Sequence, residues 1–503
     1  MKRRTFLSFA SAMSLSAQAR WAGNPTVKAG FAETDITPEI GMEQPGGYGK
    51  VFHKTLHDRC KVRAAVFDDG RKQAAIVGLD ALIVPRQLVL AVRKEIEAKA
   101  GIPGNAVMVN ASHSHSSGPI GMVQPGEYDG ASELVRKLAY EKSSAADPRY
   151  LRSLHQQIVA AVVDAHNKRA DLLCGVGMGR EEKVGFNRRV RMKNGRTFSH
   201  PGQNNPDMVQ YAGPIDPDVG VVGAWDKEGK LTGCIVNFSC HATTSPGGIS
   251  ANWIYYMEKA IRGFFGEHVT VVFVQGACGD VTQVDNFSKV LPPSGDESAQ
   301  FVGGRVGAEA VRVLLSMPRG ALTPVDSLSR VIRIPRRKPA ESTLREARSL
   351  ISKDPNVAGV TEWTFAKETL MLEYLIQKEP VVDAEVQAIQ VGPAVFVSNP
   401  AEYFVEFGLD IKAKSRFPFT FPAELSNGCV GYVPTEEALS ESGGGYETRL
   451  TSYSNLIPSA GRTIANTGIA LANQLTPGKL PEAPPAKPFS APWRYGDVPA
   501  QTQ

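Results

Sequence analysis

The chain has 503 residues, of which 42% are hydrophobic and 21% are charged, and its formal net charge is +5. This composition is typical of a globular protein with a large core. Three of the cationic residues lie in the first four positions, so the rest of the chain has a net charge close to zero. Such a charge gives no reason to expect nucleic acid as a partner. The sequence contains no apolar run of about 18 or more residues, so no transmembrane helix is predicted.

The first 19 residues, MKRRTFLSFASAMSLSAQA, have the features of an export signal. A basic start precedes a mildly apolar stretch, and Ala17-Gln18-Ala19 forms a small-residue cleavage site. Arg3-Arg4 followed by Phe6-Leu7 favours the twin-arginine route over an ordinary secretory signal. We therefore expect residues 1–19 to be a leader and the mature protein to be periplasmic or secreted.

A strand, a helix and a second strand follow one another from about Lys72. The run 73–80 is apolar, Leu88, Val92 and Ile96 recur at helical spacing, and 106–109 is a second apolar run. This order predicts a parallel strand pair with a helical crossover. The pattern recurs with a helix over 150–166, a strand over 234–238, a helix over 252–265 and a strand over 269–274.

The C-terminal third contains further elements. The runs 385–391 and 394–398, joined by Gly392-Pro393, predict a hairpin, and a helix is expected from Asn399 to about Lys414. Residues 340–380 predict a charged, amphipathic helical excursion. From Thr476 the chain is rich in proline and predicts an extended strap or a disordered end. We divide the chain into a leader (1–19), a catalytic domain (20–475) and a tail (476–503).

Polar side chains follow the predicted strands at the points where the strands end. In α/β sheets, ligands gather beyond the carboxyl ends of strands, so residues far apart in the chain can meet at one rim. We therefore predict an α/β fold with a mixed sheet core, flanking helices and an active site at the strand ends. The residues so placed are Asp80, His113, His241, Asp280 and Glu402.

Three of the nine histidines of the chain could share a metal ion. His113 and His115, two residues apart on an expected extended segment, would point the same way, and His241 follows another strand. Glu402 could add a carboxylate, which gives the ligand types that catalytic zinc uses. Each histidine taken alone is more often a structural residue.

Other catalytic motifs are absent from the sequence. There is no H-E-x-x-H helix, no G-x-S-x-G elbow and no phosphate-binding loop of the G-x-x-x-x-G-K-[ST] form. Gly175-Val-Gly-Met-Gly179 predicts a tight turn rather than a dinucleotide site. The six cysteines contain no C-x-x-C pair, and Cys234, Cys240 and Cys278 are expected to be buried and free.

Between about Gly30 and Leu475 the sequence resembles the catalytic domain of the neutral (non-lysosomal) ceramidases. Six segments carry the resemblance in order: Phe31–Pro38, His113–Pro119, Asn237–Thr243, Gln275–Thr282, Asn399–Phe404 and Gly431–Thr435. The resemblance implies a zinc-dependent amide hydrolase. It implies that His113, His241, Glu402 and Tyr432 bind the metal and that His115 faces the substrate.

Several roles remain open at this stage. Tyr432 could bind zinc, donate a hydrogen bond to developing negative charge, or be a core residue. Asp80 and Asp280 could orient the ligand imidazoles or cap strand ends. Arg188 could bind a polar part of the substrate, with a salt bridge as the alternative. Thr282 stands where the family has a serine, and its extra methyl group narrows the expected headgroup pocket.

The expected function is hydrolysis of an amide, most simply an N-acyl bond, of a small or lipid-like substrate by a zinc-activated water. We expect His115, Thr282 and Tyr432 to take part in catalysis. Two alternatives remain: the same metal centre could cleave an ester or a carbohydrate-linked bond, or the protein could bind metal without catalysis. A closed, cysteine-rich site would indicate the latter, but the cysteines and histidines do not cluster in the sequence.

Overall fold

The computed structural model describes residues 27–483, 485, 495–496 and 499–502. The leader expected in residues 1–19 lies outside the described residues, as does part of the tail. Among the described residues, no helix combines the length and hydropathy needed to cross a membrane.

The larger sheet has eight strands and mixed pairing. β5 and β6 are parallel, as are β13 and β14, and all other neighbours are antiparallel. A helix joins each parallel pair, as the strand-helix-strand patterns predict. The order across the sheet is β14 (Thr270–Gln275), β13 (Leu231–Phe238), β12 (Asp218–Trp225), β7 (Ala170–Arg180), β1 (Val27–Asp35), β4 (Lys61–Asp68), β5 (Gln73–Leu79) and β6 (Val107–Ala111).

A second, smaller sheet has four strands, and the remaining paired strands form short sheets of two or three. The predicted hairpin is confirmed, with Gly392 at a φ of 59° in its turn, and the following strand pairs parallel to it. Mixed sheets with flanking helices confirm the predicted α/β class. The order is β16 (Val325–Pro335), β17 (Val381–Val391), β18 (Ala394–Ser398) and β20 (Phe419–Ala423).

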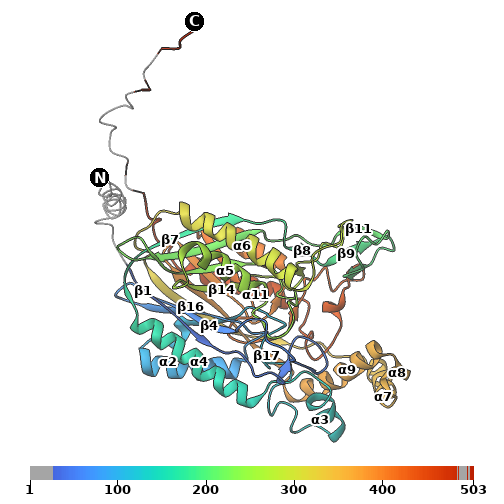
Figure 1. Cartoon of the computed structure of the whole chain (residues 1–503). Helices are drawn as coiled ribbons and strands as arrows, with labels where there is room; N and C mark the ends of the chain where they lie inside the picture. The colour runs from blue at the N-terminus through green and yellow to red at the C-terminus, as the bar shows by residue number, and fades with distance from the viewer. Residues whose placement is uncertain (1–26, 484, 486–494, 497–498, 503) are drawn as a thin grey trace.

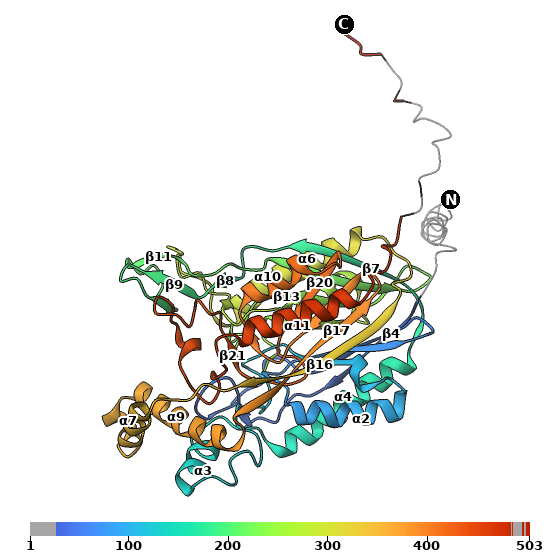
Figure 2. The same cartoon turned by 180° about the vertical axis from the view of Figure 1, so that it is seen from behind.

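Three pairs of helices cover the sheets (Figures 1 and 2). α4 packs on β1 and β4 with α2 beside it, α6 packs on β7 and β12 with α5 beside it, and α10 and α11 cover the smaller sheet. Their ends follow ordinary capping rules: Asp147 caps the N-terminus of α4 ahead of Pro148, and Gly101 ends α2 at a φ of 67°. The bounds are α2 (Arg86–Ala100), α4 (Pro148–Asn167), α5 (Trp253–Phe265), α6 (Gly295–Ser316), α10 (Val405–Lys414) and α11 (Ala460–Gln474).

The predicted helical excursion forms a separate lobe (Figure 1). Its helices pack with α3 around a small apolar cluster that includes Leu138, Leu370 and Met371. The helices are α3 (Glu133–Tyr140), α7 (Glu341–Ile351), α8 (Pro355–Ala358) and α9 (Val360–Lys378). The short elements are β2 (Glu43–Gln44), β3 (Val51–Phe52), η1 (Gly104–Ala106), β8 (Phe186–Asn187), β9 (Arg189–Met192), β10 (Thr197–Ser199), β11 (Met208–Tyr211), β15 (Val281–Thr282), β19 (Glu402–Tyr403), β21 (Tyr432–Val433) and η2 (Tyr446–Thr448).

Two local predictions were wrong. The glycines of 175–179 lie in the extended strand β7 rather than in a turn, because α6 packs directly on them: a Cβ atom at Gly177 would lie 2.7 Å from Val313. The helix expected from Asn399 begins only at Val405. Glu402 and Tyr403 instead pair parallel with Tyr432 and Val433, so tertiary pairing overrides the local helix preference.

The larger sheet curls until its two ends meet. β14, at one edge, packs against β4, β5 and β6 at the other, and Val77 and Val274 belong to the same buried apolar cluster. Each such side chain stabilises the fold by about 1.5–3 kcal/mol through burial. The curl brings the carboxyl ends of β6 and β14 together, with the backbone N–H of Gln275 donating to the Asn110 side chain at 2.8 Å.

Candidate active site

The carboxyl ends of β6 and β13 deliver the three candidate histidines to one point. The segment after β6 is not extended as expected, because the backbone turns at His113 with a φ of 60°. Such a φ is uncommon for a residue other than glycine. The imidazoles of His113 and His115 nevertheless meet, with their Nε2 atoms 3.2 Å apart.

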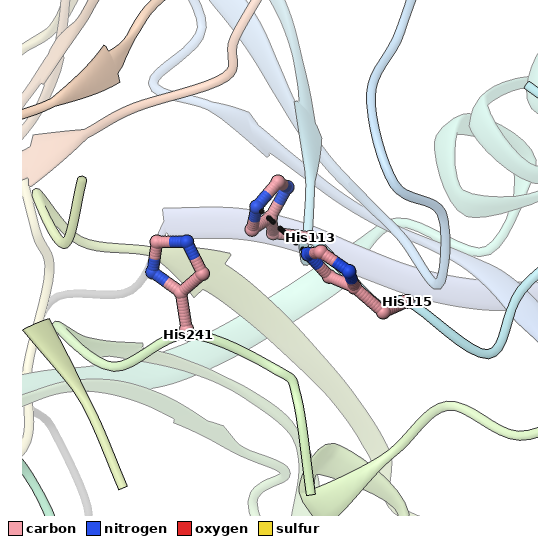
Figure 3. Close-up of side chains that lie close together, drawn as sticks. All are labelled: His113, His115 and His241. Carbon is pink, nitrogen blue, oxygen red and sulfur yellow. Dashed lines mark hydrogen bonds between the residues drawn. The ribbon is translucent and has the colours of Figure 1, made fainter. Parts of the chain in front are cut away.

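The three imidazoles face one another in the interior (Figure 3). The rings of His113 and His241 have centroids 4.7 Å apart and are nearly perpendicular. One nitrogen from each of His113, His115 and His241 lies within 4.8 Å of the others. His113 and His241 are buried, whereas His115 is half-buried. The histidines that follow different strands therefore lie close together, as the sequence predicts.

Glu402 brings a carboxylate to the same point. Its Oε2 atom lies 3.1 Å from Nε2 of His113 and 3.3 Å from Nε2 of His241. Among the described residues, Oε2 is buried and has no hydrogen-bond partner, although buried carboxylate oxygens are normally satisfied.

The other ring nitrogens show which tautomers the histidines adopt. Nδ1 of His113 lies 3.0 Å from the carbonyl of Leu82, and Nδ1 of His241 lies 2.7 Å from the carbonyl of Cys278. A carbonyl can only accept, so both Nδ1 atoms carry a proton, and in the neutral ring each Nε2 keeps an acceptor lone pair; that of His241 also lies 3.2 Å from Nη1 of Arg188. Two imidazole lone pairs and a carboxylate oxygen thus face one another, and this donor set fits a zinc ion.

Arg188 lies beside the histidine cluster and is fully enclosed. Its Nη1 is 3.2 Å from Nε2 of His241, and its Nη2 donates to the hydroxyl of Tyr432 at 3.0 Å. The salt bridge considered as the alternative also forms, because Nε donates to Glu447 at 2.6 Å. Arg188 is therefore both paired and placed at the site.

Tyr432 reaches the site through the pairing of β19 with β21, which sets it directly opposite Glu402. Its hydroxyl is hydrogen-bonded to Arg188 and to Tyr446 rather than to the imidazoles. Sequence reasoning missed Tyr446 and Glu447, because no motif or spacing distinguishes them. Their only signal was proximity along the chain to Tyr432.

The remaining predicted residues have other partners. The backbone of Thr282 pairs with Phe186, two residues before Arg188, and its hydroxyl lies 3.1 Å from Oε1 of Gln283. Asp80 accepts from Arg63 at 2.8 Å, and Asp280 accepts from Asn187 at 2.7 Å. The expectation that these two carboxylates contact the imidazoles was wrong, because backbone carbonyls fill that role.

Comparison with known proteins relates the chain to one family. No family model matches it. Over 338 residues, or 64% of the chain, it is 25% identical to the neutral ceramidase of Pseudomonas aeruginosa, and it spans 46% of the length of that protein. Two solved structures share the fold of this chain, each with a TM-score of 0.65 and 17% identity. The first is a ceramidase complexed with C2, and the match covers 92% of this chain and 78% of that chain. The second is the neutral ceramidase from Pseudomonas aeruginosa, and the match covers 91% of this chain and 77% of that chain. The chain is therefore similar in sequence to a neutral ceramidase over part of its length and shares the fold of the solved ceramidase structures.

Proposed function

We propose that the protein is a zinc-dependent hydrolase that cleaves the amide bond of an N-acylated substrate. The observation that carries the proposal is the meeting of two Nε2 lone pairs with the unpartnered Oε2 of Glu402. His113, His241 and Glu402 would hold the metal, with Tyr432 beside them. The similarity to a neutral ceramidase supports an amide as the bond cleaved.

Bound zinc would polarise the substrate carbonyl and lower the pKa of a water molecule. The protein supplies the remaining chemistry. The side chain of His115 is half-buried beside the two proposed ligand imidazoles, and its ring nitrogen could accept the proton that the attacking water loses. Proton return from His115 to the leaving nitrogen would complete the cleavage.

Arg188 and Tyr432 are the hydrogen-bond donors for charge that develops on the carbonyl oxygen. Both groups are enclosed and held by other contacts, Arg188 by Glu447 and Tyr432 by Tyr446. Donors fixed in advance need little reorganisation when charge develops, and one such donor contributes about 3 kcal/mol to lowering a barrier.

The decisive experiment measures fatty-acid release from ceramide, from short N-acyl compounds and from matched esters. We expect amide cleavage that stops after metal removal with a chelator and returns with zinc. Activity that persists in metal-free protein would contradict the proposal. Preferential cleavage of the esters would support the second candidate substrate class.

We also propose that the protein is exported and that residues 1–19 are its leader, on the basis of the sequence pattern alone. The expected result is a mature N-terminus near Arg20. Replacement of Arg3 and Arg4 by lysine should retain the precursor in the cytoplasm. Unchanged export of that variant would exclude the twin-arginine route.

A further inference from the structure

Glu424 lies behind the site, at the end of β20, and its side chain is fully buried. The segment that begins there contacts the ends of three strands that carry the site. The backbone N–H of Glu424 donates to the carbonyl of Gln275 at the end of β14, that of Leu425 donates to the carbonyl of Ala401 after β18, and Ser426 pairs with Asn110 at the end of β6.

The carboxylate of Glu424 holds two of these segments at once. Its Oε2 accepts the backbone N–H of Cys278 at 3.0 Å and the backbone N–H of Tyr403 at 2.7 Å. Its Oε1 lies 3.0 Å from the thiol sulfur of Cys278. None of these partners is a cation, and burial raises the pKa of Glu424 to about 8, so its carboxyl group is held in the interior by hydrogen bonds rather than by an ion pair.

Each of these two backbone partners is bonded to a proposed zinc ligand, one through a hydrogen bond and the other through the peptide chain. Cys278 presents the carbonyl that accepts from Nδ1 of His241 at 2.7 Å. Tyr403 follows Glu402 in the chain and lies with it in β19. The side chain of Glu424 therefore contacts both the residue that orients His241 and the residue that adjoins Glu402.

We propose that Glu424 is a positioning residue that sets the zinc affinity of the site by fixing His241 and Glu402 relative to each other. The inference rests on the proposed zinc site, because it assigns a role toward that ion. Groups that orient metal ligands typically contribute about 10- to 100-fold to metal affinity.

The test compares three variants by chelator competition and by thermal unfolding of the metal-free protein. Glu424→Leu removes both acceptor contacts and should weaken zinc binding by about 10- to 100-fold. Glu424→Gln keeps an oxygen that can accept both N–H groups and should retain an affinity within a few-fold of wild type. Glu385→Gln is the matched control, because Glu385 is also buried but pairs with Arg86 and Arg93 of α2.

The outcomes separate the inference from the proposed function. Wild-type protein that binds no zinc overturns the proposed function and this inference together. Wild-type protein that binds zinc, with Glu424→Leu binding equally well, overturns only the inference. Equal weakening by Glu385→Gln would also overturn it, since that result would indicate general destabilisation. If Glu424→Leu does not fold, Glu424→Asp replaces it, because its shorter side chain cannot reach both N–H groups, and unchanged affinity in that variant would equally overturn the inference.

Discussion

Two buried polar clusters of this protein differ in how their charges are balanced. In the first, the site cluster of His113, His115, His241 and Glu402, electron-pair donors face one another. In the second, a charge network, Lys61, Arg63 and Arg262 surround Asp80 and Glu258. A network in which every carboxylate meets a cation is complete as a structural unit. Electron-pair donors that face one another in this way form an arrangement in which a metal ion could bind.

The sharpest way to separate the clusters is to remove one member of the site. His113→Ala should lose zinc and reduce amide cleavage by at least about 10³-fold, because a bound metal contributes several kcal/mol of transition-state stabilisation. His155→Ala on α4 is the matched control, since His155 pairs with Glu95 near the surface. Activity retained in His113→Ala would place the reaction elsewhere.

The corresponding change in the charge network should affect folding rather than chemistry. Glu258→Leu leaves the buried Arg63 with one carboxylate partner instead of two, and breaking a buried pair costs about 3–5 kcal/mol. Chemical denaturation should report this loss, while zinc content per folded chain stays unchanged. If Glu258→Leu lost zinc while its stability stayed unchanged, the charge network would no longer differ in role from the site cluster.

Acid should also destabilise the protein through this network. Burial opposes ionisation of Glu258, but Arg63, Lys61 and Arg262 outweigh it and lower its pKa to about 2. A carboxyl with a lowered pKa contributes stability that is present above its unfolded pKa of about 4.5 and is lost as pH falls towards 2. The stability advantage of wild type over Glu258→Gln, up to about 3 kcal/mol, should therefore shrink across that window in denaturation curves. An advantage that is constant with pH would contradict this assignment.

The smallest predicted effect concerns Thr282 at the edge of the site. Its hydroxyl contacts Gln283 and the backbone N–H of Val284 rather than the site cluster. Thr282→Ala should change KM or kcat by a few-fold and leave zinc content unchanged, whereas Thr282→Ser should restore wild-type values. Unchanged kinetics in Thr282→Ala would assign Thr282 to structure alone.

The sequence allowed prediction of those parts of the fold that depend on local patterns. Apolar runs ended by Asp80 and His113 predicted β5 and β6, and the spacing of Leu88, Val92 and Ile96 predicted α2. The start of α10 was missed because the pairing of Glu402 with Tyr432 joins segments 30 residues apart. No local signal encodes such a contact.

The candidate site likewise contains residues that the sequence predicted and supporting groups that it did not. Residue type and strand-end position indicated His113, His241 and Glu402. Their supporting groups are backbone carbonyls of Leu82 and Cys278, which any residue supplies and which a sequence therefore does not reveal. The predicted roles of Asp80 and Asp280 failed for this reason: both lie near the strand ends, but their carboxylates bind Arg63 and Asn187.

The most direct measurement is the zinc content of the purified wild-type protein and of His241→Ala, determined by elemental analysis after dialysis against metal-free buffer. The account predicts about one zinc per chain in the wild type and a near-complete loss in the variant, with the fold retained. A wild type that is active while holding no stoichiometric metal, or a variant that keeps its zinc, would contradict the central claim.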